Sequence, residues 1–233
     1  MLGVVGELLI TAGVLVLFFL AWQLWWNEIV SSDEQTRSAG ELSKNWDQAL
    51  PVPPPGPHET TEPEVVPPPL IAPPAPAAAF ASMLIPRFGN DFARPVHSGI
   101  GFSVLAEGIG YYPDSQLPGQ SGNFAVAGHR TTYGKPFAQI ADLRVGDAVV
   151  IETAEGWFTY RFRNLEYVWP TGVGVLAPVP QQLKVTATDS VLTMTSCNPR
   201  FSAAERIIAY SLFESFTPRS AGAPTVLSAT AVQ

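Results

Sequence analysis

The sequence has few cysteines and few basic residues, and each shortage excludes a class of protein. Cys197 is the only cysteine in 233 residues, so no internal disulfide can form and the chain is not a disulfide scaffold. The 13 lysines and arginines are outnumbered by 20 aspartates and glutamates. Because nucleic acids are bound by clustered basic surfaces, this composition does not indicate nucleic-acid binding. The sequence also has no clear metal-binding motif, and we expect neither a metal nor a cofactor.

The acidity is confined to the N-terminal third of the chain. Residues 1–81 contain nine acidic and two basic side chains, whereas residues 82–233 contain eleven of each. A change in composition near residue 80 accompanies this change in charge. We therefore expect four parts: an N-terminal transmembrane anchor over residues 1–30, a juxtamembrane and Pro-rich linker over 31–81, a globular domain over 82–217, and a flexible tail over 218–233.

The first part contains a long apolar run. Residues 8–22 are apolar apart from Thr11, and with their flanks they approach the roughly 20 residues that cross a bilayer. Trp22, Trp25 and Trp26 crowd one end, as in an interfacial aromatic belt. A cleaved signal peptide is the competing interpretation, but its apolar region is shorter and ends in small residues. We expect a single-pass anchor, although no basic residue precedes the run to set its orientation.

A proline-rich linker follows. Residues 33–48 are compatible with a short juxtamembrane helix, which Gly40 weakens. Residues 51–76 then contain 12 prolines, and proline both fixes φ and lacks an N–H. This composition predicts an extended spacer of about 3.1 Å per residue that holds the globular domain away from the lipid. Generic disorder or a Pro-rich recognition segment are the alternatives.

From residue 82 onward, short runs rich in Val, Ile, Phe, Tyr and Thr alternate with Gly and Pro breaks. Short helices are expected near 114–119, 136–140 and 203–206. Many short strands with few helices predict an all-β closed barrel or sandwich. The expected strands are 84–87, 101–106, 123–127, 147–153, 156–168, 191–196 and 205–213.

Three residues in this domain suggest chemistry. His129 follows an apolar strand and a glycine, Cys197 ends a β-type run before a proline, and Arg206 opens the next strand. Antiparallel pairing across the intervening loop would bring Arg206 beside Cys197. His97, in a loop-like segment, is the second candidate histidine, whereas His58 lies among the prolines and cannot be positioned.

These residue types fit acyl transfer. A thiolate attacks a carbonyl, an imidazole moves protons, and a fixed cation stabilises the oxyanion. A neighbouring guanidinium also favours the thiolate form of cysteine. The alternative is that Cys197 is inert and that the chain is a non-catalytic, membrane-tethered β-domain that serves as a binding scaffold.

At these positions the chain resembles the sortases. Residues 193–197 (TMTSC) are similar to the family's TLxTC box, with Met194 in place of leucine and Ser196 in place of threonine. Residues 108–137, with their Tyr112-Pro113 pair, resemble the actinobacterial class E, or housekeeping, sortases. The resemblance covers about residues 82–216.

The resemblance implies an eight-stranded sortase-type β-barrel with short helices, and a transpeptidation in two steps. Cys197 would cleave an LPxTG- or LAxTG-like C-terminal sorting signal between Thr and Gly, forming a thioester that an amine of a lipid-linked peptidoglycan precursor resolves. His129 would move the protons and Arg206 would hold the oxyanion. Tyr112 and Ser196 would bind substrate, with Tyr112 near the second residue of the motif.

The implied partners are secreted proteins with sorting signals, and the implied location is the cell membrane with the catalytic domain on the cell-wall side. A pilin polymerase, which uses a pilin lysine as acceptor, is the alternative within the family. Residues 217–233 contain no second apolar span, which favours wall anchoring. An L,D-transpeptidase is disfavoured because Ser196-Cys197 lacks the expected preceding His-Gly.

Overall fold

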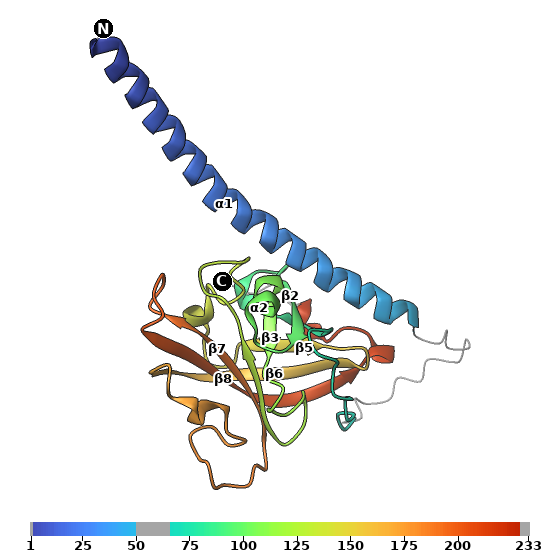
Figure 1. Cartoon of the computed structure of the whole chain (residues 1–233). Helices are drawn as coiled ribbons and strands as arrows, with labels where there is room; N and C mark the ends of the chain where they lie inside the picture. Colours follow the sequence, from blue (N-terminus) through green and yellow to red (C-terminus); the bar gives the residue numbers. More distant parts are fainter. Residues whose placement is uncertain (1, 50–65, 229–233) are drawn as a thin grey trace.

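The computed structural model describes residues 2–49 and 66–228. Eight β-strands close into a barrel in the order β1-β2-β3-β4-β7-β8-β6-β5 (Figure 1). This architecture confirms the predicted all-β class and the eight-stranded barrel. The strands are β1 (Ala79–Leu84), β2 (Ala93–Ser98), β3 (Ile109–Tyr111), β4 (Gly122–Ala127), β5 (Ala148–Glu152), β6 (Gly156–Val168), β7 (Ser190–Asn198) and β8 (Glu205–Pro218).

Every strand contributes apolar side chains to one core inside the barrel. Alternate residues of a strand point to the same face, so Phe124 and Val126 of β4 lie in this core, as do Leu192 and Met194 of β7. All four are fully buried. The ends of β4 and β7 therefore project from a tightly packed, rigid base.

The strand boundaries correct part of the sequence interpretation. The last five predicted strands correspond to β4–β8, but the strand predicted at 84–87 is wrong, because β1 ends at Leu84 and a 3₁₀ turn spans Pro86–Phe88. The strand predicted at 101–106 is also wrong, because that segment forms helix α2 (Phe102–Glu107). Strands β2 and β3 were not predicted. Of the three expected helical pieces, those near 114–119 and 203–206 are wrong, and the one near 136–140 overlaps a 3₁₀ turn over Ile140–Asp142 only at its last residue.

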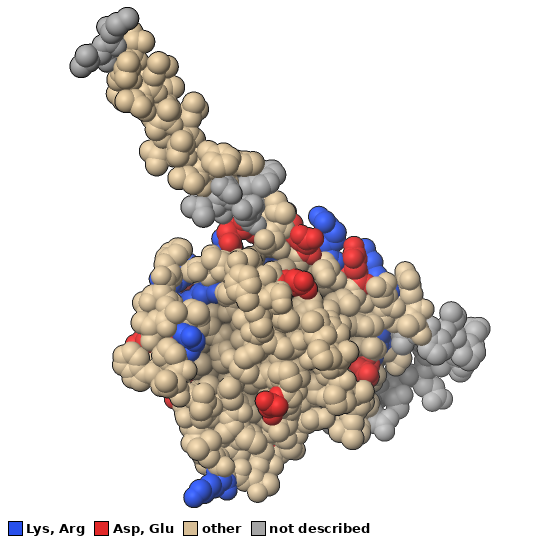
Figure 2. All heavy atoms as spheres, in the orientation of Figure 1, with Lys and Arg blue, Asp and Glu red and all other residues tan. Residues whose placement is uncertain are grey.

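A single helix, α1 (Leu2–Ala49), runs through both the apolar segment and the predicted juxtamembrane helix. Its window Gly3–Trp22 is long and apolar enough to cross a membrane, with a mean hydropathy of 2.5 and no residue buried. This half projects away from the barrel (Figure 1). On the face seen in Figure 2 it carries no charged side chain, and charged residues gather where the helix meets the barrel.

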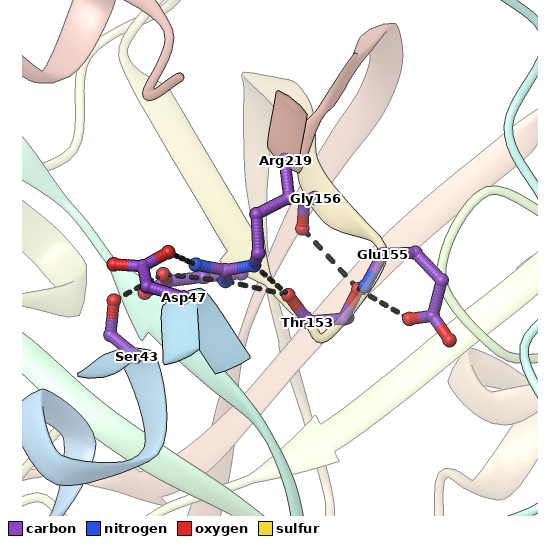
Figure 3. Close-up of polar contacts among 7 residues, drawn as sticks. Ser43, Asp47, Thr153, Glu155, Gly156 and Arg219 are labelled. Carbon is purple, nitrogen blue, oxygen red and sulfur yellow. Dashed lines mark hydrogen bonds and ion pairs between the residues drawn. The ribbon is translucent and has the colours of Figure 1, made fainter. Parts of the chain in front are cut away.

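The other half of α1 lies on the barrel (Figure 1). Near its end, Ser43 donates a hydrogen bond to the Glu152 carboxylate at 2.6 Å. Figure 3 shows Arg219 reaching from the end of β8 to Asp47 of α1 and to the Thr153 carbonyl, which it meets at 2.7 Å. Because α1 contacts the barrel directly, the following linker cannot serve to separate the two.

The expected spacer and flexible tail therefore need correction. Residues 50–65 of the linker lie outside the described part of the chain. Beyond them, Ile71 packs against the barrel core and the Ala77 N–H donates to the Ser98 carbonyl at 2.9 Å, so this part runs along the barrel instead of extending from it. In the tail, Arg219 is 4% exposed and Val226 packs against a second small apolar cluster. The tail up to residue 228 is thus attached to the barrel.

Candidate active site

The parallel pairing of β4 with β7 places His129 and Cys197 at the same end of two neighbouring strands. The last residues in register are Ala127 and Thr195. The pairing continues beyond them, since the Gly128 N–H donates to the Thr195 carbonyl at 3.1 Å and the Ser196 hydroxyl donates to the Gly128 carbonyl at 2.8 Å. His129 and Cys197 each lie two residues past the last register pair, at the same end of neighbouring strands.

Arg206 lies on the other side of Cys197. Strands β7 and β8 are antiparallel, and Cys197 is the direct partner of Arg206. Directly opposed residues project to the same face of a sheet, with Cβ atoms about 4.5–5.5 Å apart. Arg206 is half-buried as a residue, and its Nη1 donates to the Ala203 carbonyl at 3.0 Å and the Glu205 carbonyl at 2.9 Å. These bonds hold it over the β7–β8 loop. The three predicted residues thus occupy one end of the barrel.

The electrostatic environment suits a neutral imidazole on His129. Burial lowers the pKa of His129 below its usual value of 6.5 because desolvation disfavours the charged form. Its Nε2 is buried and has no hydrogen-bond partner among the described residues. The ring lies 5.1 Å from the Tyr133 ring, centroid to centroid. Cys197 is a free, half-buried thiol. A buried donor or acceptor with no partner is available to a ligand.

Comparison with known proteins decides the family. The family model described as "Sortase domain" matches residues 83–213. The chain belongs to the sortase family. Sortases are cysteine transpeptidases, which agrees with a lone cysteine between a histidine and an arginine. The region matched spans β2–β7 and most of β8, and it contains Cys197, His129 and Arg206.

Relatives place this sortase near the class E proteins, as the sequence predicted. It is 33% identical to Sortase SrtE1 of Streptomyces coelicolor over 231 residues, which is 96% of this chain but only 60% of that protein. Sortase E of Streptomyces avermitilis is 40% identical with a TM-score of 0.60, over 66% of this chain and 99% of that one. Sortase E1 of S. coelicolor, solved with a tripeptide in the active site, is 34% identical with a TM-score of 0.61, over 66% and 98%.

Two residues that the sequence interpretation missed hold the Cys197 end of β7 in this sortase. Arg130 donates from Nη1 to the Cys197 carbonyl at 3.3 Å and to the Asn198 side-chain oxygen. Asn198 in turn donates to the Glu205 carboxylate at 2.8 Å. Arg130 directly follows His129, and Asn198 directly follows Cys197. The parallel pairing of β4 with β7 that places His129 near Cys197 therefore also places Arg130 near Asn198. The positions of Arg130 and Asn198 next to the two predicted site residues were the sequence signal from which they could have been found.

The two predicted substrate-binding residues lie close to the site. The Tyr112 hydroxyl is 3.4 Å from the Thr195 hydroxyl, which itself donates to the Val126 carbonyl at 3.1 Å. Ser196 is 4% exposed and its hydroxyl proton is used on Gly128. Ser196 therefore joins β7 to the segment that carries His129, while Tyr112 is half-buried beside the Cys197 strand.

The second candidate histidine lies elsewhere. His97 is 7% exposed on β2, with Nε2 3.7 Å from the Glu107 carboxylate. It pairs with Gly110 of β3, which pairs with Ala127 of β4, which pairs with Thr195 of β7. Three strand spacings of about 4.8 Å therefore separate it from the Cys197 strand. His97 lines a cavity of about 470 Å³ beneath α1 and takes no part in this site, and His58 lies outside the described residues.

Proposed function

We propose that this sortase is a membrane-anchored transpeptidase that cleaves LPxTG- or LAxTG-like sorting signals between Thr and Gly. It then joins the new threonine carboxyl end to an amine of a peptidoglycan precursor. The observation that carries the proposal is the strand register. Arg206 lies directly opposite Cys197 on the antiparallel side, and on the parallel side His129 and Cys197 each lie two residues past the last register pair, Ala127 and Thr195. A peptide as substrate agrees with the tripeptide found in the active site of sortase E1 of S. coelicolor.

In the first step, the Cys197 thiolate attacks the threonine carbonyl carbon and forms a tetrahedral oxyanion. Arg206 stabilises that charge. Both of its bonds to the described part of the chain use Nη1, and a guanidinium has five N–H donors, so the donors on Nη2 and Nε remain available for the oxyanion. His129, neutral at the start, takes the proton of the Cys197 thiol as the thiolate forms and gives it to the glycine nitrogen as the C–N bond breaks. The products are a thioester on Cys197 and a released glycine amine.

In the second step, the acceptor amine attacks the thioester. Neutral His129 takes the proton that the amine loses, and the C–S bond breaks to return the Cys197 thiolate. The lowered pKa of His129 favours this base form of the imidazole. The net result exchanges one amide bond for another, so the reaction needs no oxidant or reductant. Half-burial of Cys197 and His129 limits the competing attack by water.

The proposal places the barrel on the cell-wall side of the membrane. Helix α1 supplies the anchor through Gly3–Trp22, and the proposed substrates, secreted proteins and a lipid-linked precursor, occur on that side. The same three residues would serve an acceptor lysine on a pilin equally well. The choice between these acceptors therefore rests on experiment.

The test uses the full chain in detergent micelles with fluorogenic LPxTG and LAxTG peptides. We expect cleavage between Thr and Gly, a mass consistent with an acyl-enzyme on Cys197, and transfer to an added amine. Cys197→Ala should abolish cleavage without changing the circular dichroism spectrum. Substantial turnover by that variant would refute the mechanism, and absence of any acyl-enzyme in the wild type would favour a binding scaffold. Adding a peptidoglycan stem peptide and a lysine-containing pilin peptide in competition distinguishes the two acceptors.

A further inference from the structure

Helix α1 contacts the segment that carries His129. The Glu28 carboxylate accepts a hydrogen bond from the Tyr133 N–H at 3.1 Å, and the Gln35 side-chain amide donates to the Tyr133 carbonyl at 2.9 Å. The backbone N–H and the backbone carbonyl of Tyr133 are therefore both hydrogen-bonded to side chains of the helix. Residues 28 and 35 lie outside the region that the sortase family model matches.

This contact is closely fitted. Gln35 is only 3% exposed. Tyr133 has a φ of +53°, in the left-handed region that non-glycine residues rarely adopt, so its conformation needs support from its surroundings. Gly134 next to it has a φ of +69°, and a Cβ there would lie 2.8 Å from the Gln35 side-chain oxygen. The loop approaches the helix so closely that a larger residue than glycine does not fit.

The Tyr133 side chain passes this constraint on to His129. Its ring lies 5.1 Å from the His129 ring on one side and meets Phe102 of α2 edge-on at 5.4 Å on the other. The loop also closes back on itself, because the Phe137 N–H donates to the His129 carbonyl at 3.0 Å. A displacement of Tyr133 would therefore move or free the imidazole.

We propose that Glu28 and Gln35 are positioning residues for catalysis: through Tyr133, helix α1 holds the His129 imidazole in place for proton transfer. The inference rests on the proposed function, in which His129 moves the protons. Neither residue touches the substrate, so loss of their contacts affects the chemical step more than substrate binding. Displacements of about 1 Å in such a site can lower rates a hundredfold.

The experiment measures steady-state kinetics of the full chain in micelles with the fluorogenic peptide. For Glu28→Ala/Gln35→Ala we expect kcat to fall about tenfold while KM stays within about twofold. Glu28→Gln should retain nearly full kcat, because its amide oxygen still accepts from the Tyr133 N–H. Gln35→Glu keeps the side-chain size but replaces the donor by a carboxylate facing a carbonyl, and it should lower kcat as the alanine variant does.

Matched controls separate loop positioning from general loosening of the helix. Glu34→Ala and Gln48→Ala remove an acid and an amide from exposed positions of the same helix, and kcat should not change. Ser43→Ala/Asp47→Ala removes the contacts with Glu152 and Arg219 at the far end of the docked segment (Figure 3). That variant should lower Tm and leave kcat within about twofold.

The outcomes distinguish this inference from the proposed function. If Cys197→Ala is inactive while Glu28→Ala/Gln35→Ala matches the wild type, the positioning role is refuted and the transpeptidase remains. An equal loss of kcat in the Ser43→Ala/Asp47→Ala variant, or failure of Glu28→Gln to retain activity, would also overturn it. Turnover by Cys197→Ala would refute the proposed function itself. If the double alanine variant fails to fold, the Gln35→Glu and Glu28→Gln pair carries the test alone.

Discussion

Arg206 lies directly across the antiparallel β7–β8 pair from Cys197. The six residues between β7 and β8 form the loop whose carbonyl at Ala203 accepts a hydrogen bond from the same arginine. The position of the guanidinium thus depends on strand register and on loop conformation together. A change in the conformation of this loop would therefore displace the cation even where the strands keep their register.

Replacing Arg206 by alanine should lower kcat by about 10²–10³-fold, because a preorganised donor to the oxyanion is lost. Arg206→Lys should recover only part of the rate, since an ammonium cannot hold the Ala203 and Glu205 carbonyls and the oxyanion with the same planar fork. The measurement is peptide cleavage at saturating substrate. Arg161→Ala, which removes a surface ion pair with Glu214, is the control and should have wild-type kcat. A twofold effect in Arg206→Ala would exclude the oxyanion role.

Replacing Tyr112 by phenylalanine should change the ratio of LAxTG to LPxTG turnover. A phenol can hydrogen-bond the backbone N–H of the motif's second residue, and proline lacks that N–H. One such bond is worth about 0.5–1.5 kcal/mol, which corresponds to a several-fold and at most about tenfold shift in relative kcat/KM. Thr195→Val, which removes the hydroxyl 3.4 Å from that phenol, tests whether the orientation of Tyr112 matters. An unchanged ratio in Tyr112→Phe would leave the tyrosine with a packing role.

Stability should fall as the pH drops from 7.5 to 5.5. Burial lowers the pKa of both His97 and His129 from 6.5, and for His97 the nearby Glu107 only partly opposes this. The unfolded chain then binds more protons than the folded one below about pH 6.5, so stability rises with pH in this window and is lost as the pH falls. Urea unfolding at several pH values measures the slope. His97→Gln should reduce that slope, and an identical slope in the variant would show that His97 does not contribute.

Arg219 should be required for stability. It is buried with Glu152 at 2.8 Å, and its guanidinium lies 4.6 Å from the Trp157 ring centroid and 5.3 Å from that of Trp46. Removing one partner of a buried ion pair typically destabilises by about 3–5 kcal/mol. We expect Arg219→Met to lose about 3 kcal/mol in denaturant unfolding, and Glu152→Gln in the same background to restore part of it. If the double variant is less stable than Arg219→Met, the uncompensated Glu152 carboxylate is not the cause of the stability lost in Arg219→Met.

Prediction from sequence succeeded where strands are long and strongly β-forming. Strand β6 was predicted at its observed limits, 156–168, because aromatic and β-branched residues run between clear glycine breaks. Strand β2 was missed because it contains Arg94, Pro95 and His97, which are atypical of strands. Strand β3 has only three residues, which are too few to show the two-residue alternation of apolar and polar side chains that is typical of a strand. Helix α2 was taken for a strand because a short apolar run does not distinguish the two.

For the site, the nearness of Arg206 to Cys197 could be expected from an antiparallel hairpin, which is a local relationship. The nearness of His129 was supported by family resemblance, because a parallel pairing of β4 with β7 across more than 60 residues leaves no local signal. The contacts of Glu28 and Gln35 with Tyr133 span 105 and 98 residues. Such contacts depend on where a helix meets a barrel, and no spacing in the sequence encodes that.

Under the proposed membrane anchoring, the continuity of α1 would fix the height of the active site above the lipid surface. Trp22 ends the apolar window and Glu28 already contacts the loop that carries His129. Six residues of helix rise about 9 Å. With Gly3–Trp22 in a bilayer, the reacting bond must therefore come within a short distance of the headgroups, and the site cannot search a larger volume on a loose tether. A sorting signal whose motif lies far along an extended chain would reach Cys197 only by folding back toward the membrane.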